Sequence, residues 1–183
     1  MLNDYKERHQ QQDKAVITTG PFLVPLETDC EYQVGRENER IIIIISNPTA
    51  RKLKASLKLG VCIQPYPPAL KKDGICVIKN LPEKEFNLGT FELKPHTCTR
   101  IESDIPEVCS LGSNEGNAVV RIAAKGDFLL CGHDCKPACG LLEISVVGGS
   151  IYNPGVPGLE QADPVTLFRY HDFVVCEGED CWC

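Results

Sequence analysis

Eleven cysteines are the residues of this 183-residue chain with the clearest capacity for chemistry. So many thiols in a chain of this size indicate disulfide bonds or metal ligands, because most proteins of a reducing compartment have few. The odd number means that at least one thiol stays free, binds something or bonds to another chain. The candidates for disulfides or cross-links are Cys30, Cys62, Cys76, Cys98, Cys109, Cys131, Cys135, Cys139, Cys176, Cys181 and Cys183.

The densest group places three thiols and one imidazole within nine residues, at Cys131, His133, Cys135 and Cys139. Zinc takes four ligands of these types. The spacing differs from that of the common paired zinc knuckles, however, and a loop rich in glycine and proline also suits a disulfide. Two hypotheses stay open here. The four residues bind a metal, or, as we prefer, the thiols form disulfides or interchain bonds with no metal.

A second group, Cys176, Cys181 and Cys183, lies in an acidic C-terminal stretch. A bond between Cys181 and Cys183 would close a tight ring, so bonds to the domain or to another molecule are easier to form. The C-x-x-C motif of thiol oxidoreductases is absent. The carboxylates of this stretch could bind a divalent cation, although a solvated acidic tail is the simpler interpretation.

Motifs of the common enzyme classes are absent from the sequence. There is no G-x-S-x-G nucleophile elbow, no H-E-x-x-H motif and no glycine-rich phosphate loop. The four histidines are His9, His96, His133 and His171. We interpret Tyr170-His171-Asp172 as a charged pair with cross-strand hydrogen bonds near a sheet edge. The sequence therefore predicts no enzyme, no catalytic residue and no cofactor.

The composition is that of an ordinary globular domain. Hydrophobic residues make up 43% and charged residues 24% of the chain, and the formal net charge of −6 argues against nucleic-acid binding. No window reaches the ~20 apolar residues needed to cross a bilayer. The N-terminal stretch carries Asp4 and Glu7 and lacks the apolar core of a secretory signal. We therefore expect the protein to reach an oxidising place without the ordinary secretion route.

The segment 39–59 (ERIIIIISNPTARKLKASLKL) indicates the architecture. Five consecutive isoleucines, 41–45, favour a strand covered on both faces, because β-branched residues pack well on a pleated surface. A turn around Pro48 follows. Alternating leucine or alanine and lysine then predicts a second strand over 53–59, with one buried face and one cationic face in water.

Further strand patterns recur between Gly and Pro breaks, and no long segment keeps a helical period. We predict strands at 15–19, 22–26, 61–64, 75–79, 86–93, 98–102, 118–124, 128–131, 141–147 and 165–175. In the strand at 86–93, we expect Phe86, Leu88 and Thr90 to share one face. The predicted fold class is all-β, an antiparallel sandwich of the jelly-roll kind.

We divide the chain into an N-terminal arm or connector (1–26), a β-sandwich domain (27–175) and a cysteine-rich tail (176–183). The arm has two open interpretations. It donates a strand to a neighbouring chain, or the same piece is the first strand of its own sandwich. The residues of this candidate assembly strand are Ala15, Val16, Ile17, Thr18 and Thr19.

The segments 41–48 (IIIIISNP), 91–100 (FELKPHTCTR), 126–130 (GDFLL), 142–148 (LEISVVG) and 165–175 (VTLFRYHDFVV) together resemble the small sandwich subunits of spore-forming Firmicutes, notably the endospore appendage fibre proteins. The resemblance implies a jelly roll behind a flexible N-terminal connector, stacking by sheet augmentation, and disulfides through the connector. It also implies synthesis in the mother cell without a signal peptide. The arm before Cys30 has no cysteine, so Cys30 or the tail would have to take the connector's cross-linking role.

We therefore expect a structural subunit that polymerises head to tail with copies of itself, in an extracellular or spore-surface fibre or coat. Strand augmentation and disulfides would hold the polymer together, with no nucleic acid and no membrane insertion involved. The main alternative is a zinc-binding protein using Cys131–Cys139. A carbohydrate-binding or adhesive module is a third hypothesis.

Overall fold

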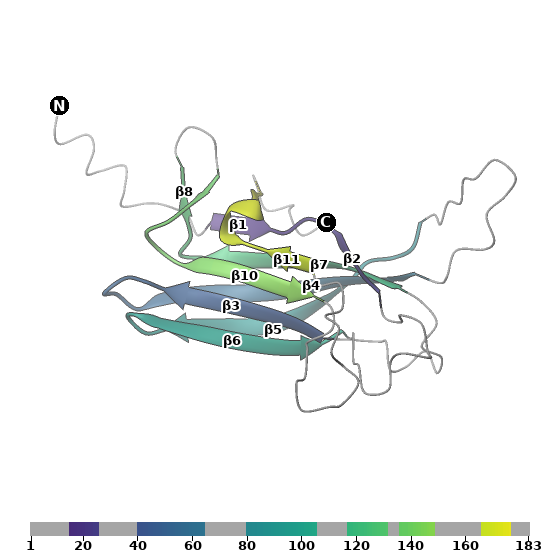
Figure 1. The fold of residues 1–183 in the computed structure, drawn as a ribbon, viewed down its shortest axis with the longest axis horizontal. Coiled ribbons are helices and arrows are strands. Elements are labelled where there is room, and N and C mark those ends of the chain that lie inside the picture. The colour runs from purple at the N-terminus through teal and green to yellow at the C-terminus, as the bar shows by residue number, and fades with distance from the viewer. Residues whose placement is uncertain are drawn as a thin grey trace, which may run out of the picture.

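A computed structural model describes residues 15–25, 40–64, 80–105, 117–131, 136–148 and 166–176. These residues form two antiparallel sheets that face each other (Figure 1). The all-β sandwich predicted from the sequence is confirmed. The finer prediction of a jelly roll is not confirmed by the strand order.

The first sheet has the order β12-β1-β7-β4-β5, with β2 also pairing with β7. Its strands are β1 (Ala15–Thr18), β2 (Phe22–Pro25), β4 (Leu53–Gln64), β5 (Lys84–Leu93), β7 (Asn117–Gly126) and β12 (Val174–Val175). The second sheet has the order β11-β10-β3-β6. Its strands are β3 (Arg40–Asn47), β6 (Thr97–Asp104), β10 (Glu143–Gly148) and β11 (Thr166–Phe168). A small hairpin of β8 (Leu129–Leu130) and β9 (Pro137–Ala138) stands apart from both.

The core lies between the sheets and is built by alternate residues of the central strands. Ile41, Ile43 and Ile45 of β3 are fully buried, as are Leu57 and Leu59 of β4. The outer face of β3 is less uniform, because Ile42 is buried whereas Ile44 is 37% exposed. The prediction of a strand covered on both faces therefore holds at Ile42 and fails at Ile44.

Lys54 and Lys58 of β4 face outward, as predicted, but they and the preceding Lys52 are paired with acidic residues of β5. Glu92 lies 3.3 Å from Lys52 and 3.4 Å from Lys54, and Glu85 lies 3.2 Å from Lys58. The hydrogen bonds and charges of Lys52 and Lys54 lower the pKa of Glu92. This face is therefore a row of exposed ion pairs rather than a cationic stripe.

The N-terminal residues 15–25 belong to the sandwich. Both β1 and β2 run along β7, and Thr18 pairs with Ala123 whereas Phe22 pairs with Val120. Three residues on one side thus face two on the other, which is a bulge. Gly20 allows it with a φ of +70°, a backbone conformation that side chains disfavour. Residues 15–25, which the predicted division assigns to the arm, are thus paired within the sandwich.

The last predicted strand, 165–175, is interrupted. Between β11 and β12 the chain forms a 3-10 helix, Tyr170–Asp172, in which the Asp172 carboxylate accepts a 2.8 Å hydrogen bond from the Arg169 N–H. His171 and Asp172 form an exposed pair at 3.2 Å within this turn. At His171 and Asp172, contacts within one turn therefore replace the expected cross-strand hydrogen bonding.

A buried amide joins two turns at one end of the sandwich. The Asn47 amide nitrogen donates to the carbonyl groups of Arg51, Leu93 and Lys94, at 2.7, 3.1 and 3.0 Å. Its carbonyl oxygen accepts from the N–H and the hydroxyl of Thr49, at 3.0 and 2.8 Å. Since the side chain is only 1% exposed, this one residue ties the β3–β4 turn to the β5–β6 turn.

Candidate functional site

The predicted site residues that the structure describes lie in two halves of the sandwich. We define these halves by the two ends of β4. One half holds Leu53, the β3–β4 and β5–β6 turns and the β8–β9 hairpin, and we call it the hairpin half. The other half holds Gln64, and we call it the far half. The twelve residues of β4 span about 36 Å. We therefore assign each cysteine to the half that contains the strand end nearest to it along the chain.

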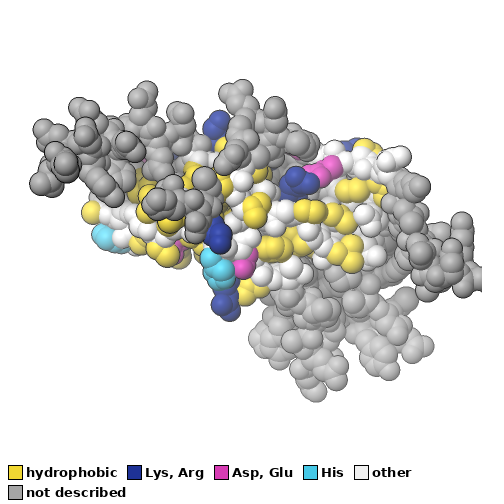
Figure 2. All heavy atoms as spheres, turned by 90° about the horizontal axis from the view of Figure 1, so that it is seen from above, with side chains coloured by type: hydrophobic (Ala, Val, Ile, Leu, Met, Phe, Trp, Pro, Cys, Tyr) yellow, Lys and Arg dark blue, Asp and Glu magenta, His cyan; other side chains and the backbone are white. Residues whose placement is uncertain are grey.

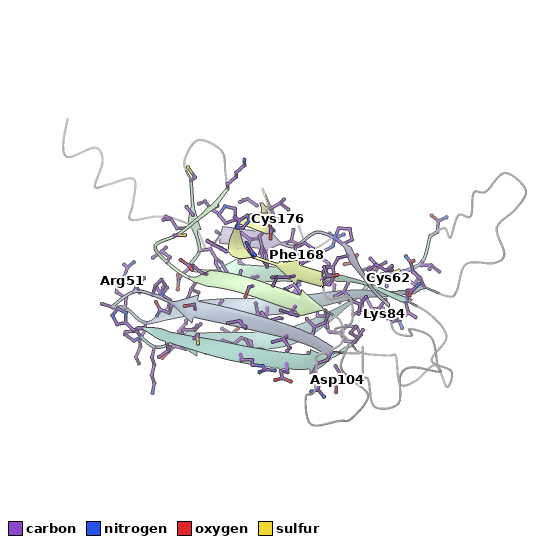
Figure 3. The ribbon with its side chains drawn as sticks, in the orientation of Figure 1. Arg51, Cys62, Lys84, Asp104, Phe168 and Cys176 are labelled. Atoms are coloured by element: carbon purple, nitrogen blue, oxygen red, sulfur yellow. The ribbon has the colours of Figure 1, made fainter. Side chains whose placement is uncertain are left out.

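The described cysteines of the hairpin half are Cys98, Cys131, Cys139 and Cys176. Cys98 is the second residue of β6 and lies opposite Ser46, next to the β3–β4 turn. The N–H of Cys176 donates to the Val16 carbonyl at 2.9 Å, which places Cys176 near the start of β1. Cys62 lies in the far half, where its buried thiol lies 3.8 Å from the Leu81 carbonyl oxygen (Figure 3).

Six predicted cysteines lie outside the described residues: Cys30, Cys76, Cys109, Cys135, Cys181 and Cys183. Chain length bounds their positions, because a residue spans at most about 3.6 Å. Cys109 follows Ile105 by four residues and Cys76 precedes Asn80 by four, so each lies within roughly 14 Å of a far-half residue. Cys30, five residues after Pro25, lies within about 18 Å of the far half. Cys135 directly precedes Lys136 in the hairpin half.

The cysteines therefore fall into two groups. Cys62 lies in the far half, and Cys30, Cys76 and Cys109 are joined to it by four or five residues of chain outside the described part. Cys98, Cys131, Cys139 and Cys176 lie in the hairpin half, to which Cys135 is joined directly. Cys181 and Cys183 follow Cys176 by five and seven residues, at most about 18 and 25 Å, so chain length does not exclude a bond between either of them and a cysteine of the far-half group. Apart from these two, a disulfide between the groups has to join different chains.

The β8–β9 hairpin keeps Cys131 and Cys139 apart. The N–H of Cys131 donates to the Lys136 carbonyl at 2.7 Å, so Cys131 lies opposite Lys136. Cys139 lies three residues further along an extended strand, about 10 Å away. The Cα atoms of a disulfide lie at most about 7 Å apart, so in this register Cys131 and Cys139 do not bond to each other. His133 and Cys135 lie outside the described residues.

The Cys139 thiol lies beside the carboxylate of Glu143. The charge of Glu143 and a hydrogen bond to its carboxylate raise the pKa of Cys139. Beside this pair, the Tyr170 hydroxyl donates to the Leu129 carbonyl at 3.1 Å, and its burial raises the pKa of Tyr170. Since the thiolate is the nucleophile in disulfide exchange, Cys139 is disfavoured as an attacking group.

The candidate assembly strand Ala15–Thr19 is already paired. β1 pairs with β7 on one side and with β12 on the other, and Ile17 is fully buried in the core. The N–H of Thr19 donates to the Ile122 carbonyl at 3.0 Å, and the Thr19 hydroxyl accepts from the Ile122 N–H at 3.1 Å. In the structure, this segment is the first strand of its own sandwich, which is the second of the two interpretations.

An open strand edge is present instead at β6, a site that the sequence analysis missed. Every residue of β6 pairs with β3 in one unbroken register, and no other described strand lies on its second side. The other outer strands are less suited to pairing, because β2, β11 and β12 have four, three and two residues and β5 contains a bulge. In TCTRIESD, both faces of the strand carry polar residues, and this composition is the sequence signal that could have indicated an edge strand.

Hydrophobic side chains reach the surface along the edge that carries β2, β11 and β12. Leu23, Leu167 and Val174 are each about half exposed. Figure 2, which views the molecule from this side, shows hydrophobic side chains among charged and polar ones. Among the described residues, no helix is long and apolar enough to span a membrane.

Comparisons with known proteins return no relative of this chain. No protein-family model, no curated protein and no solved structure matches it.

Proposed function

We propose that this protein is a non-catalytic structural subunit that assembles with copies of itself into an extracellular or spore-surface fibre or coat. The observation that carries the proposal is the open edge of β6, eight residues long and free of bulges. An edge strand presents unpaired N–H and C=O groups, and monomeric proteins usually shorten, bend or cover such edges. Pairing at this edge would extend the four-stranded sheet from one chain into the next.

The second part of the proposal is covalent. Exposed thiols lie at Cys98 and Cys131 in the hairpin half, whereas Cys62 lies in the far half and Cys30, Cys76 and Cys109 are joined to it by short stretches of chain. Contact of the hairpin half of one chain with the far half of the next is a head-to-tail arrangement that continues as a filament. In each cross-link, two protein thiols pass two electrons and two protons to a low-molecular-weight disulfide, which leaves as two thiols.

Proline substitutions on β6 test the strand-pairing part. N–H groups of successive residues point to opposite sides of a strand, so one of Thr99 and Arg100 directs its N–H toward β3 and the other away from it. Of Thr99→Pro and Arg100→Pro, one therefore breaks the intrachain ladder and the other spares it. We expect the variant that folds, by circular dichroism, to lose polymers in negative-stain electron microscopy. A folded variant that polymerises like the parent protein would refute assembly through β6.

Peptide mapping under non-reducing conditions tests the covalent part. We expect multimers on non-reducing gels, and disulfide-linked peptides that join a hairpin-half cysteine such as Cys98 to a far-half cysteine such as Cys109. Such a pair cannot form within one chain, because the chain-length bounds keep the two cysteines apart. Disulfides found only within each half, in assembled material, would contradict head-to-tail cross-linking.

A further inference from the structure

The outer face of β6 carries a charge pattern that is complementary to itself. Arg100 and Glu102 alternate with inward-facing Thr99, Ile101 and Ser103. The Arg100 guanidinium lies 2.7 Å from the Glu102 carboxylate, and both side chains are solvent-exposed. On the adjacent end of β3, Arg40 lies 3.3 Å from Glu102 and 3.6 Å from Asp104. With two cations and two anions, the strip has no net charge.

Neutrality matters because a second copy of the same strip would meet no net repulsion. The exposed side chains lie along the open edge, where a pairing strand would place its own side chains beside them. Opposite charges directly across two strands stabilise the pair, and like charges destabilise it. The strip can therefore distinguish between registers.

Strand geometry leaves few registers for a second β6. Two identical strands related by a two-fold axis pair antiparallel. Outward-facing residues of one strand must lie opposite outward-facing residues of the other, because otherwise the apolar face of one chain turns to water. The pair is then centred on one residue. Centring on Arg100 places two arginines opposite each other, and centring on Glu102 places two glutamates opposite each other. Centring on Ile101 places Arg100 of each chain opposite Glu102 of the other.

We propose that β6 pairs antiparallel with β6 of a second copy, centred on Ile101, so that two four-stranded sheets become one. The partner is this chain itself, and the inference rests on the proposed function of self-assembly. Both Arg100–Glu102 pairs are attractive in this register, and Cys98 faces Asp104 of the second copy rather than another cysteine. Ile101, which packs against the core, meets its counterpart on the inner face. This contact is two-fold and non-covalent, so disulfides between the halves would link such pairs into longer polymers.

Two single charge reversals test the register. Arg100→Glu gives a strand with glutamate at both positions, and Glu102→Arg gives one with arginine at both. Each variant alone then has like charges opposite each other twice, and we expect its dissociation constant to rise by about tenfold or more. In an equimolar mixture, every cross-strand pair is attractive again. We expect the mixture to associate like the parent protein.

The measurement is sedimentation velocity in reducing buffer, which removes disulfides, with circular dichroism to show that each variant is folded. Lys125→Glu, a charge reversal at an exposed residue of β7 in the other sheet, is the matched control and should associate like the parent. High salt should weaken the parent's association, because exposed charge pairs are screened.

The outcomes separate this inference from the proposed function. If the parent associates in reducing buffer but neither reversal weakens it, or the mixture does not recover, the register is wrong while strand-mediated assembly stands. If the parent is monomeric in reducing buffer and polymerises only when oxidised, pairing through β6 is refuted and the covalent part of the proposed function remains. If the parent neither associates nor polymerises under any condition, both proposals fall.

Discussion

Replacing Asn47 by alanine tests whether one buried amide holds the hairpin half together. The substitution removes five hydrogen-bond contacts, three donated to carbonyl groups and two accepted from Thr49. The Leu93 carbonyl that loses its donor is buried, whereas those of Arg51 and Lys94 are partly exposed and can take water instead.

The expected loss follows from this difference. A buried carbonyl left without a donor costs about 1–3 kcal/mol, and each partly exposed hydrogen bond contributes about 0.5–1.5 kcal/mol net. The free energy of unfolding should therefore fall by roughly 3 kcal/mol. For a domain of this size such a loss lowers the melting temperature by roughly 10 °C. Because Asn47 joins two turns that flank Cys98, the thiols of this half should also react faster with a thiol reagent.

Thermal or urea unfolding in reducing buffer measures the loss in the free energy of unfolding, and Asn87→Ala is the matched control. Asn87 is exposed, and its side chain accepts one hydrogen bond, 2.9 Å from the Gly89 N–H. We expect this control to lose about 1 kcal/mol or less. Equal losses for the two variants would show that the Asn47 contacts contribute no more than an exposed turn bond, and the reasoning about the buried amide would be refuted.

Four further predictions follow from the packing and the pKa shifts. Gly126→Ala should destabilise by several kcal/mol, since the added Cβ meets the backbone of β4; equal urea midpoints would contradict this. Ile43→Asp should prevent folding, because it buries a carboxylate in the core, and a native spectrum would show the strand to be misplaced. Glu143→Gln should lower the pKa of Cys139 and speed its alkylation at pH 8; an unchanged rate would exclude this cause. Burial raises the pKa of Tyr170 above its ordinary 10.0, so the unfolded chain ionises first and stability should fall above about pH 10; in a Tyr170→Phe variant the fall should be smaller.

The central strands were predictable because each has a pattern with a single physical meaning. Alternation of Leu53, Ala55, Leu57 and Leu59 with lysine and serine fixes one face in the core, and all four are buried. Consecutive isoleucines give a strand but do not say how much of its outer face is covered. The exposure of Ile44 depends on neighbouring strands of the second sheet, which local sequence does not reveal.

The strand β5 shows how one residue defeats alternation. The pattern predicts Phe86, Leu88 and Thr90 on one face, yet the register with β4 shifts between Leu57 and Lys58. Gly89, with a φ of +108°, sits in this bulge. Beyond it the inward residues are Phe91 and Leu93, whereas Thr90 is exposed. A bulge inverts the parity of every later residue in the strand, so the prediction was right before Gly89 and wrong after it.

The N-terminal strand shows the limit of arguing from composition. Polar residues 1–14 lead into 15–19 and then Gly20-Pro21, which suggests a segment separate from the domain. The pairing of Ala15–Thr18 with β7 is a contact between residues more than 100 positions apart. A donated strand and an intrachain strand need the same alternation and the same edge, so the sequence could only leave both interpretations open.

Assigning the cysteines to the two halves depends on the number of times that the chain crosses the sandwich. Sequence patterns alone did not determine this number. Each strand that crosses the sandwich takes the chain to the opposite half. If the number of predicted strands is wrong by one, the later cysteines are therefore assigned to the wrong half, until a second miscount cancels the first. The predicted strand 75–79 lies outside the described residues, and the predicted strands at 15–19 and 22–26 prove to be one bulged crossing along β7. Once the crossings are known, Cys98 is seven residues of extended chain, about 23 Å, from Ile105, and Cys109 can reach back at most about 14 Å of this, which leaves more than the roughly 7 Å that a disulfide spans between Cα atoms. A bond between these two cysteines is therefore the sharpest available sign of a second chain.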